Sequence, residues 1–229
     1  MIPKELITVL TEAVKRSEQS TYRDIKKGDL SGEENITADL LKSIKLYCSE
    51  VIKANEGKFG PYEVATRIFK KVTEEPNIGA DFAITVRKFE RKKNGFLKHV
   101  GVKTALIQSK LPDNSDYEKL KTQIKDMQEY TDESYVAVYD GKGVYVSHSK
   151  DVIEASHRVK NVPGDKRQTL DKFFRDIFKC SKGEKGFDAR NIITDDVDDI
   201  YYYFPSGLAA TDTLEIIVTE HNPDNNKRN

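Results

Sequence analysis

The segment VKTALIQSKL, residues 102–111, decides the fold prediction, because an apolar run turns polar at Gln108 and again at Lys110. In an extended strand alternate side chains share one face, so Gln108 and Lys110 point to the same side as Leu106. Burying an amide or an ammonium group without a partner costs several kcal/mol. The strand therefore predicts that a neighbouring segment supplies partners for both groups.

The preceding residues predict that neighbour. ADFAITVRKFE (80–90) is typical of a second strand, and RKKNGFLK (91–98) is a hairpin connection to the strand at 102–111. An earlier strand, YEVATRIFKKV (62–72), is separated from it by the turn EEPNIG (74–79). Antiparallel strands joined by a hairpin place the start of one beside the end of the next. Asp81 is therefore expected to lie near Gln108 and Lys110.

A long helix over residues 31–57 is expected to add a fourth polar group. Its apolar positions recur every three or four residues, at Ile36, Leu40, Ile44, Tyr47 and Val51. Ser31 and Glu34 fit a capping box, and Gly57 suits the C-terminal end. At about 100° per residue, Glu33 lies near the middle of the apolar stripe, so its carboxylate should face the end of the sheet.

The remaining segments complete a mixed architecture. Residues 1–20 and 112–131 are predicted helices, the second with a stripe of Leu120, Ile124 and Met127, and residues 134–149 form a hairpin around Asp140 and Gly141. An amphipathic helix over 169–179 and strands at 198–207 and 213–221 follow, although the last segment could be helical. The predicted fold is α/β (α+β), with a mixed central β-sheet flanked by helices.

The expected domain organisation has four parts. Residues 1–30 form an N-terminal helical segment, 31–150 an α/β core, 151–221 a C-terminal extension packed on that core, and 222–229 a disordered tail.

The net charge does not indicate a binding partner, but basic and acidic residues are distributed unevenly along the chain. The chain of 229 residues has 38 basic and 38 acidic side chains, yet residues 86–126 hold eleven Lys or Arg against five Asp or Glu. Two cysteines are too few for a disulfide framework, and no stretch approaches the roughly 18 apolar residues of a membrane span. The N-terminus lacks the pattern of a signal peptide, so a cytoplasmic location without membrane association is expected. No phosphate-binding G-x-x-x-x-G-K loop and no G-x-S-x-G motif is present, which gives no support to an ATPase or a serine hydrolase.

The ordered set of Glu33 at a helix start, Asp81 after "IGA", and "QSK" closing the next strand resembles the PD-(D/E)XK nuclease superfamily. More narrowly, it is similar to the restriction-endonuclease-like branch with a D…QxK pattern, as in Mrr-type enzymes. The resemblance covers about residues 31–149 and implies a restriction-endonuclease-like core. Two positions depart from the family pattern, with Ala80 in place of the usual proline and Gln108 in place of the usual acid.

The resemblance implies a Mg²⁺-dependent endonuclease, with Mn²⁺ as a substitute ion. Asp81, Gln108 and Glu33 would hold the metal, and Lys110 would orient or help deprotonate the attacking water. Gln123, on the following helix, is a supporting candidate. DNA is favoured over RNA as substrate, a role in restriction or anti-phage defence follows by analogy, and a homodimer or a partner subunit is compatible with cutting both strands. Lys103, Lys119 and Lys121 are candidates for contacts with the nucleic-acid backbone.

Other interpretations remain open for each residue. Asp81 could simply end a loop, Gln108 and Lys110 could form the exposed face of an edge strand, and Glu33 could interact with the helix dipole. The substitution at Gln108 also leaves open a single-ion enzyme, or a module on a decayed nuclease scaffold that only binds nucleic acid or a partner protein.

Overall fold

The computed structural model describes residues 3–55, 62–68, 79–91, 97–179, 181–187 and 212–220 of the chain. Its main helices are α1 (Lys4–Lys27), α2 (Glu33–Ala54), α4 (Tyr117–Gln128), α5 (Ser149–Glu154) and α6 (Leu170–Phe178). Its strands are β1 (Tyr62–Ile68), β2 (Phe82–Arg91), β3 (Leu97–Lys110), β4 (Ser134–Asp140), β5 (Gly143–His148), β6 (Gln168–Thr169), β7 (Glu184–Lys185) and β8 (Asp212–Glu220). Two short 3₁₀ helices, η1 (Val159–Asn161) and η2 (Gly164–Lys166), lie between α5 and β6.

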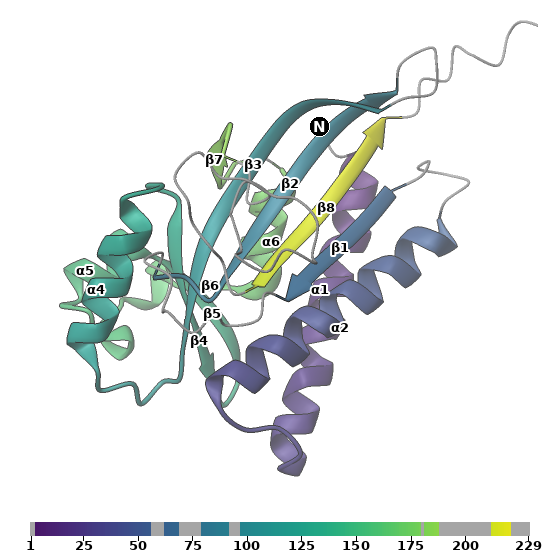
Figure 1. Ribbon diagram of the computed structural model, residues 1–229. Coiled ribbons are helices and arrows are strands. Elements are labelled where there is room, and N and C mark those ends of the chain that lie inside the picture. Colours follow the sequence, from purple (N-terminus) through teal and green to yellow (C-terminus); the bar gives the residue numbers. More distant parts are fainter. Residues whose placement is uncertain are drawn as a thin grey trace, which may run out of the picture.

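One mixed sheet organises these elements, in the order β1-β8-β2-β3-β4-β5-β6, with β7 paired to β3 (Figure 1). β2 and β3 are antiparallel, as the hairpin connection predicts, and Phe82 pairs with Ile107. β4 runs parallel to β3, with Lys110 opposite Val138, and β8 lies between β1 and β2. The α/β class and the mixed sheet flanked by helices are thus confirmed.

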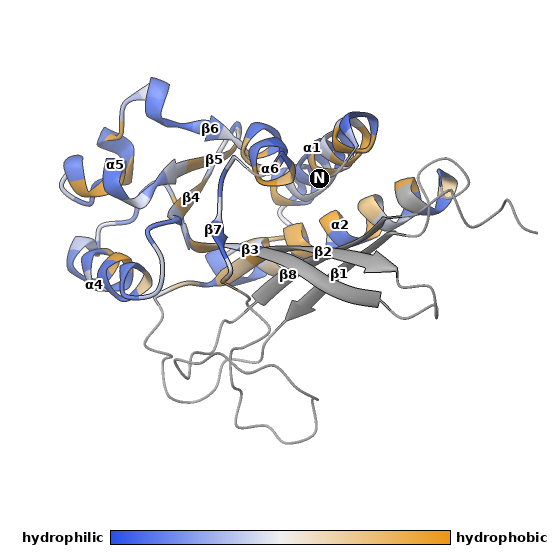
Figure 2. Cartoon of the chain, turned by 90° about the horizontal axis from the view of Figure 1, so that it is seen from above, coloured by the Kyte–Doolittle hydropathy of each residue, from blue (hydrophilic) through white to orange (hydrophobic). Residues whose placement is uncertain are grey.

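Helices cover both faces of the sheet, because β3 carries apolar side chains on both: Ala105 and Ile107 on one face and Leu106 on the other. α1, α2 and α6 pack on the face that carries Ala105 and Ile107, and Figure 2 shows α1 and α2 on the same side of the sheet. α4 and α5 pack on the opposite face, which carries Leu106. The predicted stripes of α4 and α6 are buried, and that of α2 is buried in its first part, whereas its Tyr47 and Val51 are partly buried against the same core. The buried residues are Ile36, Leu40 and Ile44 on α2, Leu120, Ile124 and Met127 on α4, and Leu170, Phe173, Phe174, Ile177 and Phe178 on α6.

Several boundaries differ from the predictions. α1 continues to Lys27, and Gly28, with a φ of 82°, ends it in the left-handed conformation. The carbonyl of Gly32 accepts the first intrahelical hydrogen bond of α2, from Ile36 at 3.1 Å, so Gly32 takes the N-cap position predicted for Ser31. Residues 212–220 are a strand, which excludes the helical alternative for 213–221.

Some predictions cannot be compared with the structure. Gly57, the strand at 198–207 and the tail at 222–229 lie outside the described residues. Among the described residues, no helix combines the length and the apolar character that crossing a lipid bilayer requires.

Candidate functional site

The ends of β2 and β3 bring Asp81 and Gln108 into direct contact. Asp81 lies one residue before the Phe82–Ile107 pair, and its backbone N–H donates to the Ile107 carbonyl at 2.9 Å. Its Oδ2 accepts hydrogen bonds from Gln108 Nε2 and from the Ser109 backbone N–H, each at 2.7 Å. The juxtaposition predicted from the hairpin is therefore present, with Asp81 held by two donors of β3.

Lys110 and Glu33 meet at the same end of β3. Lys110 Nζ lies 3.4 Å from Glu33 Oε1, and the backbone N–H of Leu111 donates to Glu33 Oε2 at 3.2 Å. Glu33 is the first residue of α2, so the start of this helix is fixed against the strand end by both carboxylate oxygens. The structure thus assembles Glu33, Asp81, Gln108 and Lys110 at one end of the sheet.

The burial of this group excludes one of the simpler interpretations. β3 lies between β2 and β4 and is not an edge strand, and the exposed fractions of Gln108 and Lys110 are 1% and 5%. An exposed lysine on an edge strand would discourage aggregation, but a buried one needs a specific partner. Lys110 has that partner in Glu33.

A cluster of buried hydroxyl groups lies behind the site, on the opposite face of β3. Tyr139 Oη is 2.7 Å from Thr37 Oγ1 and 3.2 Å from Ser109 Oγ, and Thr37 Oγ1 donates to the carbonyl of Glu33 at 2.8 Å. We call these three side chains the hydroxyl cluster. It connects the first turn of α2 with the residue of β3 whose N–H holds Asp81.

Sequence reasoning missed the hydroxyl cluster. Thr37 lies one helical turn after Glu33, a spacing that could have placed it near the same strand end. Ser109 and Tyr139 carry no comparable signal, because their contact depends on the pairing of β3 with β4.

Gln123 lies behind the loop that carries Asp81. A side chain at Gly79 would place its Cβ atom 1.9 Å from the Gln123 carbonyl oxygen, so only glycine allows α4 to approach this loop so closely. Gly79 also has a φ of 70°. Gln123 Oε1 is buried without a hydrogen-bond partner in the structure. Gln123 therefore packs next to the site, through its backbone.

Burial shifts the pKa values of both carboxylates of the site, Asp81 and Glu33. Burial raises the pKa of Asp81, against the opposing effects of the Ser109 N–H, the charge of Lys110 and the Gln108 amide. Burial also raises the pKa of Glu33, where Lys110 opposes the shift and the charge of Asp81 adds to it. The two acids thus lie close enough to repel each other, and a nearby positive charge favours their ionised forms.

The donor set suits a hard cation such as Mg²⁺. Asp81 and Glu33 supply carboxylate oxygens, and Gln108 Oε1 is a buried amide oxygen that lacks a hydrogen-bond partner. Mg²⁺ prefers oxygen ligands, keeps several waters, and needs only one or two carboxylates. Within the described part of the chain, no three or more His, Cys, Asp or Glu side chains form a metal-binding group, so an ion here would depend on the amide. As the amide lies, its nitrogen faces Asp81, and its oxygen points elsewhere.

The lysines expected to contact nucleic acid differ in accessibility. Lys103 is buried, with an exposed fraction of 6%, which excludes it from a solvent-facing surface. Its side chain packs under Gly183, where an added Cβ would lie 2.9 Å from Lys103 Cγ. Lys119 and Lys121 are exposed on α4, and Lys121 pairs with Glu118 at 3.5 Å.

We compared the chain with protein-family models, curated proteins and solved structures, and none of the three comparisons gives a match.

Proposed function

We propose that the protein is a Mg²⁺-dependent nuclease that hydrolyses phosphodiester bonds, with DNA as the favoured substrate, built on a restriction-endonuclease-like core. A role in restriction or anti-phage defence would follow by analogy with that family. The proposal extends to a cytoplasmic enzyme that acts as a homodimer or with a partner subunit when both strands are cut.

The observation that carries this proposal is the contact of Asp81 with Gln108 at 2.7 Å, next to the ion pair of Lys110 with Glu33. Four polar side chains from three separate segments converge at one end of the sheet. Gln108 and Lys110 are buried and the two carboxylates are partly buried, which is costly unless the groups act together. Structural ion pairs also perturb pKa values, so the proposal rests on the convergence of these side chains, to which Gln108 adds a buried amide oxygen without a hydrogen-bond partner.

Each residue has a defined part in the proposed reaction. Asp81 and Glu33 would hold Mg²⁺, joined by the Gln108 amide oxygen once the amide turns over to direct that oxygen at Asp81. When bound, the ion would supply Lewis-acid activation of water and neutralise charge on the phosphate. Lys110 presents its Nζ protons beside both carboxylates and can donate to a phosphate oxygen. Its 3.4 Å separation from Glu33 Oε1 is long for a charge-assisted hydrogen bond, so a phosphate can compete for it. The Ser109 N–H keeps Asp81 oriented throughout.

The decisive experiment compares wild type with Asp81→Asn and Lys110→Met on supercoiled plasmid, linear duplex, single strands and structured RNA, with Mg²⁺ or with chelator. We expect Mg²⁺-dependent cleavage by the wild type, and loss of cleavage in both variants while circular dichroism shows an unchanged fold. Lys172→Met, on the exposed surface of α6, is the matched control and should cleave normally. Wild-type rates in Asp81→Asn or Lys110→Met would refute the proposal.

A second candidate function is a binding module on a nuclease scaffold that has lost catalysis. It is favoured by the way the four groups already satisfy one another, because Gln108 donates to Asp81 and Lys110 pairs with Glu33. Divalent-ion titration separates the two. A thermal stabilisation by Mg²⁺ or Mn²⁺ that Asp81→Asn removes supports a metal site, whereas salt-sensitive binding of nucleic acid that is indifferent to metal supports the module.

A further inference from the structure

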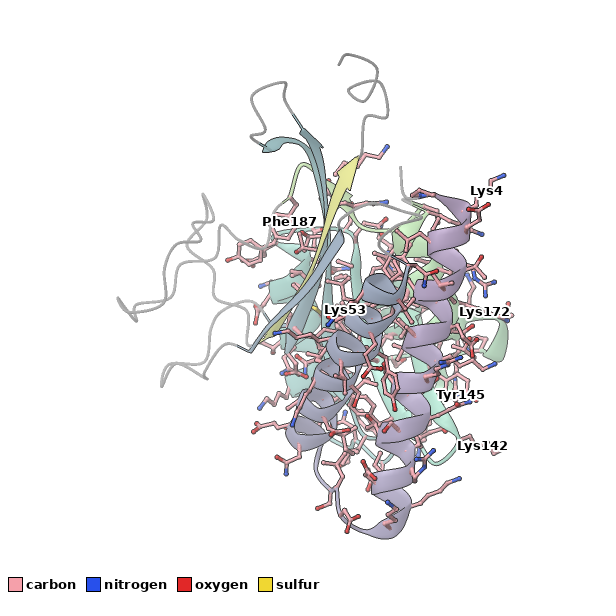
Figure 3. All side chains as sticks on the ribbon, turned by 90° about the vertical axis from the view of Figure 1, so that its right-hand side faces the viewer. Lys4, Lys53, Lys142, Tyr145, Lys172 and Phe187 are labelled. Atoms are coloured by element: carbon pink, nitrogen blue, oxygen red, sulfur yellow. The ribbon has the colours of Figure 1, made fainter. Side chains whose placement is uncertain are left out.

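A second polar feature lies outside the candidate site, between the C-terminal half of α1 and the turn of the β4–β5 hairpin. A hollow of about 480 Å³ is lined there by four cationic side chains, Lys15, Arg23, Lys26 and Lys142, together with Glu18 and Tyr22. We call this feature the basic hollow. Figure 3 shows Lys142 near the end of α1 that is remote from Lys4.

Two hydrogen bonds fix the walls of the basic hollow. Glu18 Oε1 accepts from the Val144 N–H at 2.6 Å, and the Tyr22 hydroxyl donates to the Gly143 carbonyl, also at 2.6 Å. A Cβ atom at Gly143 would lie 2.9 Å from Glu18 Oε1, so the glycine permits this close packing. The hairpin is therefore anchored to α1, and the carboxylate of Glu18 is used in that anchor.

Apart from the attraction between Lys15 and Glu18, the cations of the basic hollow are not explained by contacts within the protein. In the described part of the chain, none of these four side chains forms an ion pair or a hydrogen bond, whereas their neighbours on α1 do. Lys27 pairs with Asp24 at 3.5 Å and Arg16 with Glu12 at 3.8 Å. A cation in the last turn, such as Lys26, complements the helix dipole. The dipole does not account for Lys15 or Arg23, which lie further from the helix end.

Three cations of the basic hollow come from α1. Lys15 and Lys26 lie on one helix face, with the uncharged Gln19 and Tyr22 between them at intervals of three or four residues, and Arg23 lies beside this face. Eleven residues of helix between positions 15 and 26 span about 16 Å. A row of this length matches several successive phosphates of a strand, which follow one another every 3.4 Å or so along a duplex axis.

Topology places the basic hollow at the same end of the sheet as the candidate site. β3 and β4 run parallel, Lys110 pairs with Val138, and β4 ends two residues later, just before the turn that carries Lys142. α1 ends at Lys27, and the chain reaches Glu33 at the start of α2 six residues later. A strand bound at the candidate site can therefore continue across the ends of β3 and β4 towards α1.

We propose that the basic hollow binds the phosphates of a nucleic-acid strand that extends from the candidate site. The inference rests on the proposed function for the identity of the ligand, while the binding chemistry is that of a row of cations with a phosphate chain. Backbone contacts of this kind give affinity without sequence preference and make it depend on salt.

The test measures binding of a labelled oligonucleotide by fluorescence anisotropy in chelator, where cleavage cannot occur. Arg23→Gln/Lys26→Gln is compared with Lys4→Gln/Lys172→Gln, which removes the same two charges from exposed positions of α1 and α6. Thermal unfolding verifies that both are folded. For a single strand, each lost phosphate contact lowers the slope of log K against log salt by about 0.7, so we expect the first variant to lose about 1.4 and the control to match wild type. Equal slopes and affinities in the two double variants would overturn the inference.

Two further arms make the outcome specific. A free nucleoside diphosphate should compete only weakly, because it presents two phosphates, and competition as tight as that of the whole strand would overturn the assignment to a strand. Plasmid cleavage with Mg²⁺ separates this inference from the proposed function. If no protein cleaves the plasmid, wild type included, the proposed nuclease function is refuted. The anisotropy measurement still decides whether the basic hollow binds a nucleic-acid strand.

Discussion

The hydroxyl cluster makes a quantitative prediction for Tyr139→Phe. The Tyr139 hydroxyl is buried and lies 2.7 Å from Thr37 Oγ1 and 3.2 Å from Ser109 Oγ, so the substitution removes two hydrogen bonds and no ring contacts. Each such bond contributes about 0.5–1.5 kcal/mol. The existing hydrogen bond from Thr37 Oγ1 to Ser109 Oγ, at 3.1 Å, remains and limits the loss. We therefore expect the free energy of unfolding to fall by about 1–2 kcal/mol.

Urea denaturation and thermal unfolding measure this effect. For a domain of this size, the loss corresponds to a Tm lower by about 2–8 °C. Tyr145→Phe, on the adjacent strand β5, is the matched control, because its hydroxyl makes no hydrogen bond within the described residues and should contribute little. If Tyr139→Phe unfolds at the same urea concentration as Tyr145→Phe, the hydroxyl cluster does not hold α2 against β3, and the argument that it supports the site is wrong.

Two other predictions concern the site. Burial raises the pKa of Asp81 above the ordinary aspartate pKa of about 4, so between these two pKa values the folded state binds more protons than the unfolded state. The free energy of unfolding of the wild type should therefore fall relative to that of Asp81→Asn as the pH rises through this window. Thermal unfolding across this pH range measures the difference in stability between the two proteins, and Mg²⁺ should reduce that difference. A wild type that becomes more stable than Asp81→Asn as the pH rises in chelator would contradict the prediction. Gly79→Ala should lower the free energy of unfolding by more than about 3 kcal/mol, because its Cβ would lie 1.9 Å from the carbonyl oxygen of α4 and its φ is positive. Gly28→Ala, with a φ of 82° and no atom within 4 Å of the added Cβ, should cost only about 1–2 kcal/mol in the same urea denaturation assay, and equal losses would show that close packing is not the cause.

The sequence predicted the site geometry well where local rules determine it. The alternation along residues 102–111 and the hairpin to 80–90 fix which end of β3 faces Asp81, and neither depends on the rest of the chain. The helical period likewise placed Glu33 towards the sheet, and the structure shows it in contact with Lys110.

The sequence could not predict features that depend on distant pairing. β8 contacts β1 and β2 across more than a hundred residues of sequence, and no local pattern specifies that position. The burial of Lys103 depends on residues 181–187, which cover it. From the sequence alone, a lysine within a strand that alternates polar and apolar residues is predicted to be exposed. The length of α1 was underestimated because residues 21–27 are largely polar, and the end is set by the conformation of Gly28.

The position of β8 has a consequence for biosynthesis. Among the described strands, β1 pairs with β8 alone, so a nascent chain that has passed residue 68 carries a strand without its partner until residues 212–220 emerge. At typical translation rates that interval lasts roughly 8–30 s. During this time one edge of β2 is also open to pairing with other chains. Ribosome-bound intermediates that end before residue 212 should therefore be the species that recruit chaperones, and the emergence of residues 212–220 should close the sheet.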